Sequence, residues 1–133
     1  MSEENVDVVR RVYEAAAGRD ATGIFALYDA EVELDATRLG VGDLGIYHGH
    51  EGLRRLFGEL HEVWGQIEYD YEELIDAGQN VVAVVGRHAR GRSSGVDVEA
   101  PLAVLWTVGE GKVTRVVWFS TRAEALEAAG LSE

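Results

Sequence analysis

The sequence predicts an α+β fold in which one amphipathic helix lies across a curved, mostly antiparallel sheet. Between Tyr47 and Trp64 the apolar residues recur every three or four positions, which places them on one stripe of an α-helix. Beyond Trp64 the apolar period changes to two, and glycine-rich or polar clusters divide the chain into segments of strand length. A helix with one apolar face needs an apolar surface beneath it, and the following strands supply one.

Two shorter helices are predicted before this point. The first spans residues 3–17 and ends at Gly18, with Ser2 as its N-cap. Asp20 can cap a second helix of about two turns, whose apolar face falls within residues 24–28. The two helices should form a hairpin.

A short strand and a loop connect this hairpin to the long helix. Apolar and charged residues alternate from Val32 onward, which predicts a strand with Val32 and Leu34 facing the core. The same alternation turns Asp35 outward unless a bulge intervenes. Residues 37–45 are rich in glycine and predict a loop.

Four strand candidates follow the long helix, and short turn segments join them as antiparallel neighbours. They are residues 67–75, 81–90, 95–108 and 113–120. Pro101 cannot donate a hydrogen bond to a strand ladder, so we expect a bulge or kink there that curves the sheet. Thr121 and Glu124 have the spacing of a capping box that opens a last helix.

Composition limits the classes of function. The length suits one domain, and we treat residues 1–133 as a single domain. Lys and Arg number 12 and Asp and Glu 24, and the net charge of −12 disfavours nucleic acid and anionic membranes as partners. The absence of cysteine excludes disulfides and thiolate metal sites. No apolar run reaches membrane-spanning length and the N-terminus is acidic and polar, so we expect a cytoplasmic protein.

Apolar residues occupy consecutive positions in the later strands, within 81–85, 102–106 and 116–119. Both faces of the sheet must therefore be covered. We expect a second copy of the chain to cover the outer face, which predicts a homodimer. The alternative is that the C-terminal helix covers part of that face.

Five stretches along the chain match one family in order and spacing. They read VVRRVYEAAAGRD, GIFALYDAEVELD, YHGHEGLRRLF, DAGQNVVAVVGR and TRAEALEAAGL. Through them the chain resembles the SnoaL-like polyketide cyclase family of the nuclear transport factor 2-like (ketosteroid isomerase-like) superfamily. The resemblance implies a cone, formed by the bent sheet with helices on its concave face, usually in a dimer. Such cones hold small hydrophobic molecules, and no cofactor is expected.

The resemblance also points to candidate catalytic residues. The catalytic Asp of the isomerases falls at Leu34 here, one position before Asp35. Their oxyanion Tyr falls at Val12, one position before Tyr13. The cyclases use an acid/base Asp, commonly with a His nearby, for which the available pair is Asp35 and His88. The Arg-x-Asp pattern of the superfamily's epoxide hydrolases is absent from the central strands.

Arg87 and His88 have opposite parity in their predicted strand. Only one of them can point into the cone, where it would be a buried polar group that requires a ligand or a partner. An inward His88 can act as a general acid or base, whereas an outward one lies on the dimer face. His48 and His50 have the spacing of a metal pair, but no third ligand is suitably placed, so no metal site is expected.

Large apolar residues at inward positions are the candidates for a pocket lining. They are Tyr28, Leu34, Tyr47, Leu53, Phe57, Leu60, Trp64, Trp106 and Trp118. Aromatic rings suit a flat apolar ligand, although the same rings can simply fill the core.

Two hypotheses of function remain open. The first is an acid/base isomerase or cyclase acting on a small hydrophobic carbonyl compound. In it Asp35 or His88 moves the proton, and the hydroxyl of Tyr13 or Tyr47 stabilises the oxyanion. The second is a non-catalytic dimeric module that binds a ligand or another protein. Whether a carboxylate or an imidazole faces the cavity separates the two.

Overall fold

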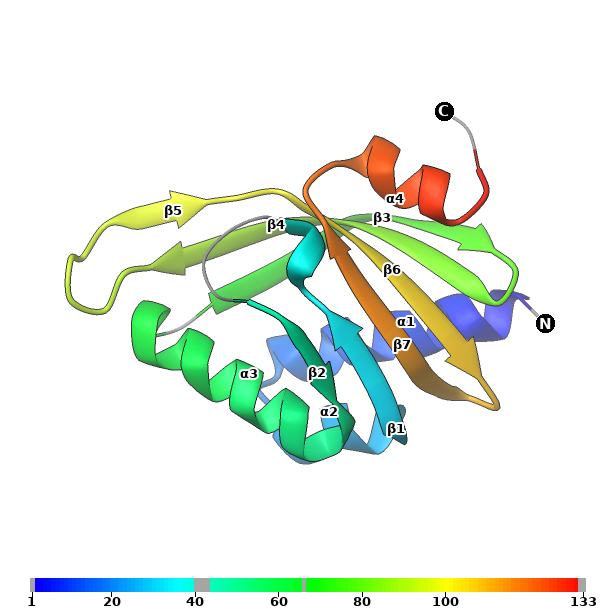
Figure 1. Cartoon of the computed structure of the whole chain (residues 1–133), viewed down its shortest axis with the longest axis horizontal. Coiled ribbons are helices and arrows are strands. Elements are labelled where there is room, and N and C mark those ends of the chain that lie inside the picture. The colour runs from blue at the N-terminus through cyan, green and yellow to red at the C-terminus, as the bar shows by residue number, and fades with distance from the viewer. Residues whose placement is uncertain (1, 40–43, 66, 132–133) are drawn as a thin grey trace.

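A computed structural model of the chain describes residues 2–39, 44–65 and 67–131. These residues form four α-helices, one short 3-10 helix and seven strands (Figure 1). The helices are α1 (Ser2–Ala17), α2 (Ala21–Leu27), α3 (Gly49–Trp64) and α4 (Arg122–Ala128), with η1 (Thr37–Leu39) as the 3-10 helix. The strands are β1 (Tyr28–Asp35), β2 (Ile46–His48), β3 (Ile67–Ala77), β4 (Asn80–Arg90), β5 (Asp97–Glu99), β6 (Leu102–Gly109) and β7 (Lys112–Phe119).

All of these strands belong to one sheet. Its order is β2-β1-β7-β6-β4-β3, and β5 pairs with β4 near the end of that strand. Paired strands are antiparallel except β1 and β7, which run parallel. The predicted α+β class with a curved, mostly antiparallel sheet is confirmed.

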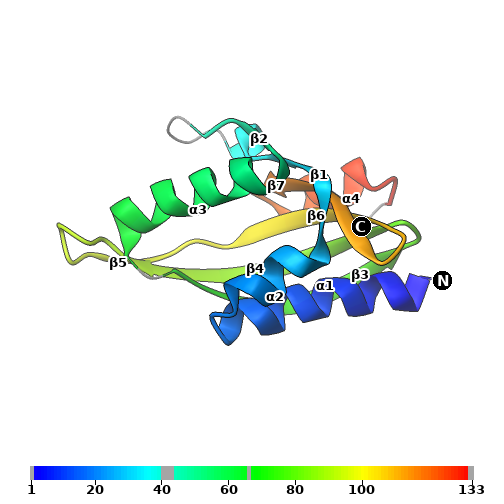
Figure 2. The same ribbon diagram turned by 90° about the horizontal axis from the view of Figure 1, so that it is seen from below.

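Three helices lie on the concave face of the sheet, and α4 lies on the other face (Figure 1). In Figure 2, α1 and α3 run along the two margins of the concave face, with β4 and β6 visible between them. Inward-facing residues of the helices and strands form one core, and burying each large apolar side chain contributes roughly 1.5–3 kcal/mol. Its fully buried members include Val9, Val32, Leu34, Leu53, Leu56, Val81, Val85, Val104, Val113 and Val116.

Local sequence signals set the starts of two helices. Asp20 accepts a hydrogen bond of 2.9 Å from the amide of Gly23 and so caps α2, as predicted. Thr121 caps α4 in the same way, because its hydroxyl oxygen lies 3.2 Å from the amide nitrogen of Glu124. α1 already includes Ser2, the residue predicted as its N-cap, and the residue before it is outside the described residues.

α1 ends at Ala17, as predicted, but Gly18 is not the residue that takes the left-handed conformation. The amide of Gly18 still donates to the carbonyl oxygen of Glu14, as in a continuing helix. The left-handed conformation that ends the helix falls on Arg19, with φ of 55°, and the amide of Asp20 then reaches back to Ala15 at 2.9 Å. Arg19 therefore occupies the position that glycine would fill without strain.

The predicted strands are present with corrected boundaries. β1 begins at Tyr28, a residue predicted to belong to the second helix, and the three-residue β2 precedes α3. Residues 40–43 of the predicted loop lie outside the described residues. The third candidate is divided at Ala100 and Pro101 into β5 and β6, because proline has no amide hydrogen for the ladder.

The helix α4 covers the apolar part of the outer face. Its buried residues Ala125 and Leu126 pack with outward-facing residues of three strands, which are Val82, Ala103, Leu105, Val117 and Phe119. The consecutive apolar positions therefore have a cover within the chain, which was the alternative to a second subunit. The homodimer stays a prediction. None of the helices in the described residues is long and apolar enough to cross a membrane.

Candidate functional site

A cavity of about 190 Å³ lies between the helices and the concave face of the sheet. Its lining is Val12, Tyr13, Ala16, Ile24, Tyr28, Leu34, Phe57, Ile67, Tyr69, Leu102, Val104, Trp106 and Trp118. Among the described residues, no carboxylate, imidazole, ammonium or guanidinium group lines this cavity. Its polar side-chain atoms are tyrosine hydroxyls and indole N–H groups.

Helical and strand periodicity bring the lining together. Val12, Tyr13 and Ala16 share the face of α1 that lies against the sheet, and Phe57 is the residue that α3 contributes. Alternate residues of β6 face the cavity, and these are Leu102, Val104 and Trp106.

A hydrogen bond between two aromatic residues fixes one wall. The indole N–H of Trp106 donates to the hydroxyl oxygen of Tyr13 at 3.2 Å, and the two rings meet at 80° with centroids 5.6 Å apart. The ring of Tyr28 packs on the same indole at a centroid distance of 6.3 Å. Aromatic pairs of this kind contribute roughly 0.5–1.5 kcal/mol beyond the area they bury, so the wall is held in one arrangement.

Three tyrosines supply the hydroxyls, namely Tyr13, Tyr28 and Tyr69. Burial raises the pKa of each of them above the ordinary tyrosine value. For Tyr13 the hydrogen bond from Trp106 opposes this rise in pKa, and for Tyr69 the cation of Arg87 does so. All three hydroxyls therefore stay protonated at neutral pH and act as uncharged hydrogen-bond donors.

Two of these hydroxyls are available to a ligand. Those of Tyr28 and Tyr69 make no hydrogen bond with another described residue. Yet in the described part of the chain no fully buried side-chain oxygen or nitrogen lacks a partner. Both oxygens therefore touch open space. The hollow that Tyr28 lines is the cavity, and Tyr69 lines the cavity and two neighbouring hollows.

Asp35 lies on the face of the sheet opposite the cavity. In the parallel pair of β1 and β7, Leu34 is matched with Val116 of the concave core, whereas Asp35 is matched with Val117. Val117 packs beneath α4, so Asp35 shares the outer face with it. Simple alternation in β1 thus turns this carboxylate outward.

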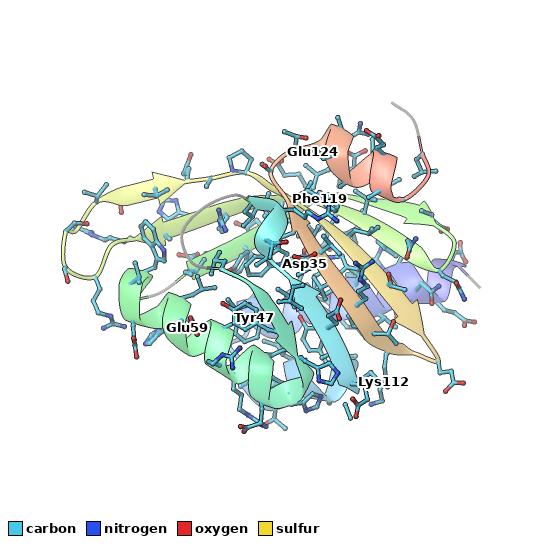
Figure 3. All side chains as sticks on the ribbon, in the orientation of Figure 1. Asp35, Tyr47, Glu59, Lys112, Phe119 and Glu124 are labelled. Carbon is cyan, nitrogen blue, oxygen red and sulfur yellow. The ribbon has the colours of Figure 1, made fainter. Side chains whose placement is uncertain are left out.

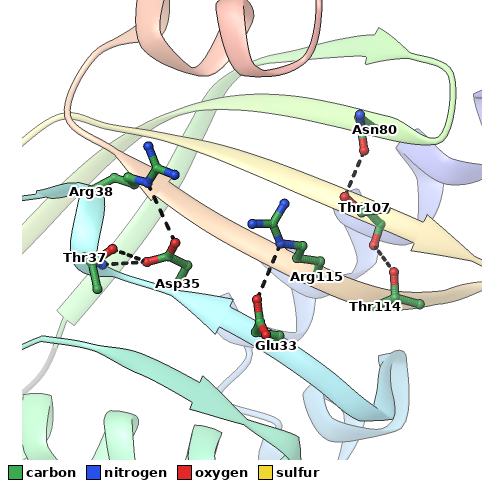
Figure 4. A network of polar contacts seen from close by, with 8 residues as sticks. All are labelled: Glu33, Asp35, Thr37, Arg38, Asn80, Thr107, Thr114 and Arg115. Carbon is green, nitrogen blue, oxygen red and sulfur yellow. Dashed lines mark hydrogen bonds and ion pairs between the residues drawn. The ribbon is translucent and has the colours of Figure 1, made fainter.

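Asp35 is labelled in Figure 3, and Figure 4 shows the local hydrogen bonds that hold its carboxylate in place. It accepts from the amide of Thr37 at 2.9 Å and from the hydroxyl of the same residue, and Nε of Arg38 lies 3.8 Å away. Burial alone would raise the pKa of Asp35, but the Thr37 hydrogen bonds together with the cations of Arg38 and Arg115 lower it. Asp35 is an ionised structural carboxylate that does not border the cavity.

The structure does not bring Asp35 and His88 together. Strands β7 and β6 lie between β1 and β4, and at about 4.8 Å per strand this separates the two backbones by at least about 14 Å. His88 is half exposed on the outer face, where its Nδ1 lies 3.4 Å from the carboxylate of Glu99. Of the three candidate catalytic residues, Tyr13 alone lines the cavity.

The predicted lining residues divide into two groups. Those that line the cavity are Tyr28, Leu34, Phe57, Trp106 and Trp118. Tyr47 and Leu53 are instead buried in the surrounding core, and Leu60 and Trp64 border a neighbouring hollow of about 240 Å³. The reason is that α3 packs against β1 and β2 at the margin of the sheet, so most of its apolar stripe fills that junction.

Other lining residues were not found from the sequence. They are Val12, Ala16, Ile24, Ile67, Tyr69, Leu102 and Val104. Strand parity with Trp106 could have identified Leu102 and Val104. No signal in the sequence distinguishes Ala16 from the other small residues of α1.

The histidines considered for metal binding have other partners. His48 Nε2 lies 3.3 Å from the carboxylate of Glu31, and His50 Nε2 lies 3.0 Å from the carbonyl oxygen of Tyr28. Within the described ranges, no three His, Cys, Asp or Glu side chains are grouped as metal ligands.

The fold class is that of the nuclear transport factor 2-like proteins. A protein of this class from Burkholderia thailandensis matches with a TM-score of 0.79 and 26% identity, over 91% of this chain and 95% of its own. TerC, crystallised with polyporic acid, matches with a TM-score of 0.77 and 23% identity, over 96% of this chain and 98% of its own. A Catenulispora acidiphila protein with a ketosteroid isomerase-like fold was solved in complex with trimethylamine. It matches with a TM-score of 0.73 and 14% identity, over 93% of this chain and 92% of its own.

The family follows from a match to the sequence itself. The model of the SnoaL-like domain matches residues 9–116, which is most of the chain. The chain therefore belongs to the SnoaL-like domain family, and the resemblance stated from the sequence is confirmed. No curated protein matches the chain.

Proposed function

We propose that this protein binds a small, flat, largely apolar molecule in the cavity between α1, α3 and the sheet. The observation that carries the proposal is an aromatic lining in which the hydroxyls of Tyr28 and Tyr69 reach open space without a partner among the described residues. Such a lining offers apolar contact over most of a ligand and hydrogen bonds to one of its oxygen atoms. Two proteins of similar fold were solved with small molecules, polyporic acid and trimethylamine, which supports the binding of a small molecule.

The size of the cavity limits the ligand. A volume of about 190 Å³ is smaller than the roughly 300–1,000 Å³ of typical ligand pockets, so one ring or two fused rings fit best. An aromatic group of that size buries about 200 Å². At about 25 cal/mol per Å² this contributes roughly 5 kcal/mol, and a hydrogen bond adds about 1 kcal/mol. We therefore expect dissociation constants of roughly 10 μM to 1 mM for simple probes.

The lining favours binding over acid/base catalysis. A general base must lie within hydrogen-bond reach of the proton that it removes. The described lining offers no carboxylate or imidazole, and the raised pKa values of its tyrosines make their phenolates inaccessible near neutral pH. We infer that the protein is a non-catalytic ligand-binding module, with the tyrosines as hydrogen-bond donors.

Calorimetric titration with 2-naphthol tests the proposal. Ala16 lines the cavity, so Ala16→Phe should fill part of it and weaken binding at least tenfold. Ala123→Phe is the matched control, because Ala123 is exposed on α4 at the other face of the sheet. Its affinity should equal that of the unchanged protein. Equal binding by the Ala16→Phe protein, with its far-UV spectrum intact, would place the ligand elsewhere and refute the proposal.

A further inference from the structure

The sequence required that either Arg87 or His88 point into the cone, and the residue that does so is Arg87. In the antiparallel pair of β3 and β4, Arg87 is directly opposite Tyr69, which lines the cavity. His88 is opposite Glu68 on the outer face. Directly opposite residues project to the same side of a sheet, so the guanidinium of Arg87 lies on the concave side.

Arg87 is half-buried, and its side chain makes no hydrogen bond or ion pair with any described residue. Other arginines of the sheet and its surroundings are paired with acids, as in Arg115 with Glu33 at 3.6 Å and Arg122 with Glu73 at 3.1 Å. Removing a charged group from water without giving it a partner is unfavourable, so an unpaired guanidinium at a half-buried position calls for an explanation.

The surroundings of Arg87 suggest one. It borders the hollow of about 240 Å³ that also has Trp64 and Leu60 of α3 in its wall. Ile67 and Tyr69 line both this hollow and the ligand cavity, so the two spaces adjoin at these residues. The cation of Arg87 also lowers the pKa of the Tyr69 hydroxyl, against the larger effect of burial.

We propose that this hollow is a second compartment of the ligand site, in which Arg87 binds a carboxylate or similar anionic group of the ligand. The inference rests on the proposed function, since the apolar body of the same ligand would lie in the aromatic cavity. A guanidinium presents a planar fork of N–H donors that matches a carboxylate, and such charge-assisted bonds are about twice as strong as neutral ones. The ligand class is thus an amphipathic aromatic acid.

Because the whole protein is negatively charged, Arg87 can attract an anionic ligand only at short range. A net charge of −12 repels anions at a distance, so steering would not favour this ligand. The acidic side chains nearest in sequence, Glu68 and Asp70, are opposite His88 and Gly86, on the outer face. Arg87 also borders an outer hollow with Glu68, Asp70 and Glu72 in its wall, but it forms no ion pair with any of them. A bound carboxylate on the concave side therefore gains from Arg87 at close range.

A pair of probes separates the two claims. The naphthalene ring of 2-naphthylacetate fits the apolar cavity, and its methyl ester has the same ring without the charge. Titration should give the carboxylate a dissociation constant at least tenfold lower than that of the ester. Arg87→Met keeps an unbranched apolar stem, so it should abolish this advantage and leave ester binding within twofold. The control Arg11→Met makes the same change of net charge at an exposed position of α1 and should keep the advantage.

Each result has a defined consequence. If neither probe binds, the proposed function fails and this inference fails with it. If the ester binds but the carboxylate gains nothing, or if Arg87→Met weakens both probes equally, only the role of Arg87 is refuted. If Arg87→Met does not fold, the role of Arg87 can still be tested by NMR on the unchanged protein. Its Arg87 Nε–H resonance should shift on adding 2-naphthylacetate and stay in place on adding the ester.

Discussion

On the outer face of the sheet, several charged and polar side chains pair with one another, whereas on the concave face three polar groups have no hydrogen-bond partner among the described residues. Asp35 is held by Thr37, and Arg115 lies 3.6 Å from Glu33 (Figure 4). Farther along the same face, the hydroxyl of Thr107 donates to the side-chain oxygen of Asn80 at 2.8 Å. These groups satisfy one another, which stabilises the fold and leaves little for a ligand.

The concave face combines an apolar wall with polar groups that form no hydrogen bond within the described part of the protein. The hydroxyls of Tyr28 and Tyr69 and the guanidinium of Arg87 have no hydrogen-bond partner among the described residues. The comparison teaches that residue type alone is a poor guide to a site. Asp35 has the right chemistry for catalysis and is fully occupied, while Arg87 has no obvious catalytic role and is available.

The largest expected effect is a loss of folding stability when a charge is placed in the apolar part of the outer face. Val82 is fully buried beneath α4, so Val82→Lys places an unpaired charge there and should destabilise the fold by roughly 3–5 kcal/mol, enough to unfold much of the protein. Val84 is on the same face of β4 but only half-buried, so Val84→Lys should keep its far-UV spectrum.

The same pair of variants tests the predicted homodimer. Light scattering of the unchanged protein should give twice the chain mass of 14.5 kDa, and Val84→Lys should reduce it to 14.5 kDa. A mass of 14.5 kDa for the unchanged protein at micromolar concentration would show that α4 alone completes the outer face.

A smaller effect is expected for the occupied carboxylate. Asp35→Asn removes charge-assisted hydrogen bonds from Thr37 and should lower the free energy of unfolding by about 1–3 kcal/mol at pH 7. Because the folded pKa of Asp35 is lowered, its contribution is complete above the unfolded value of about 3.9 and is lost as the pH falls through the folded pKa. The difference between the two proteins in denaturant titrations should therefore shrink below about pH 4.

Two further measurements make the Asp35 prediction specific. Glu31→Gln changes an exposed carboxylate whose neighbour is His48, so it should alter stability by less than about 0.5 kcal/mol. The affinity of Asp35→Asn for 2-naphthol should equal that of the unchanged protein, since Asp35 does not line the cavity. A large loss of affinity for 2-naphthol would show that Asp35 contributes to the binding site.

The smallest expected changes in stability come from replacing two tyrosines of the concave face, and they should differ between the two. Tyr13→Phe leaves the indole N–H of Trp106 without its acceptor and should cost about 1 kcal/mol of stability. Tyr28→Phe removes a hydroxyl that has no partner among the described residues, so stability should change by less than about 0.5 kcal/mol. The Tyr28 variant should nevertheless bind 2-naphthol several-fold more weakly. Equal destabilisation by both changes would mean that the Tyr28 hydroxyl has a structural role.

The fold could be predicted from the sequence because its strongest signals are local. Alternation through Leu34 and Asp35 gave the correct faces, and Pro101 marked the break between β5 and β6. The left-handed end of α1 could not be assigned correctly, because Gly18 is intrinsically better suited to that conformation than Arg19. The short β2 was missed because three residues carry too little periodicity to be distinguished from a loop.

The candidate site was predicted less well, for a different physical reason. An apolar helix stripe indicates which residues turn inward, but not which of them fill the core and which border an empty space. Leu53 and Phe57 share the stripe of α3, yet Leu53 is fully buried in the core and Phe57 lines the cavity. That distinction depends on the angle at which α3 meets β1 and β2. Likewise, parity limited the inward residue to Arg87 or His88, and only the pairing with Tyr69 decided between them.

The parallel pairing of β1 with β7 has a consequence for how the chain folds. These strands come from opposite parts of the sequence, and their pairing brings Leu34 against Val116. Contacts of such long sequence separation slow folding, because a long loop must close before they form. During synthesis β1 has only β2 as a neighbour until the segment from Lys112 leaves the ribosome. A chain interrupted before that point would expose an apolar strand edge, which favours aggregation or capture by chaperones.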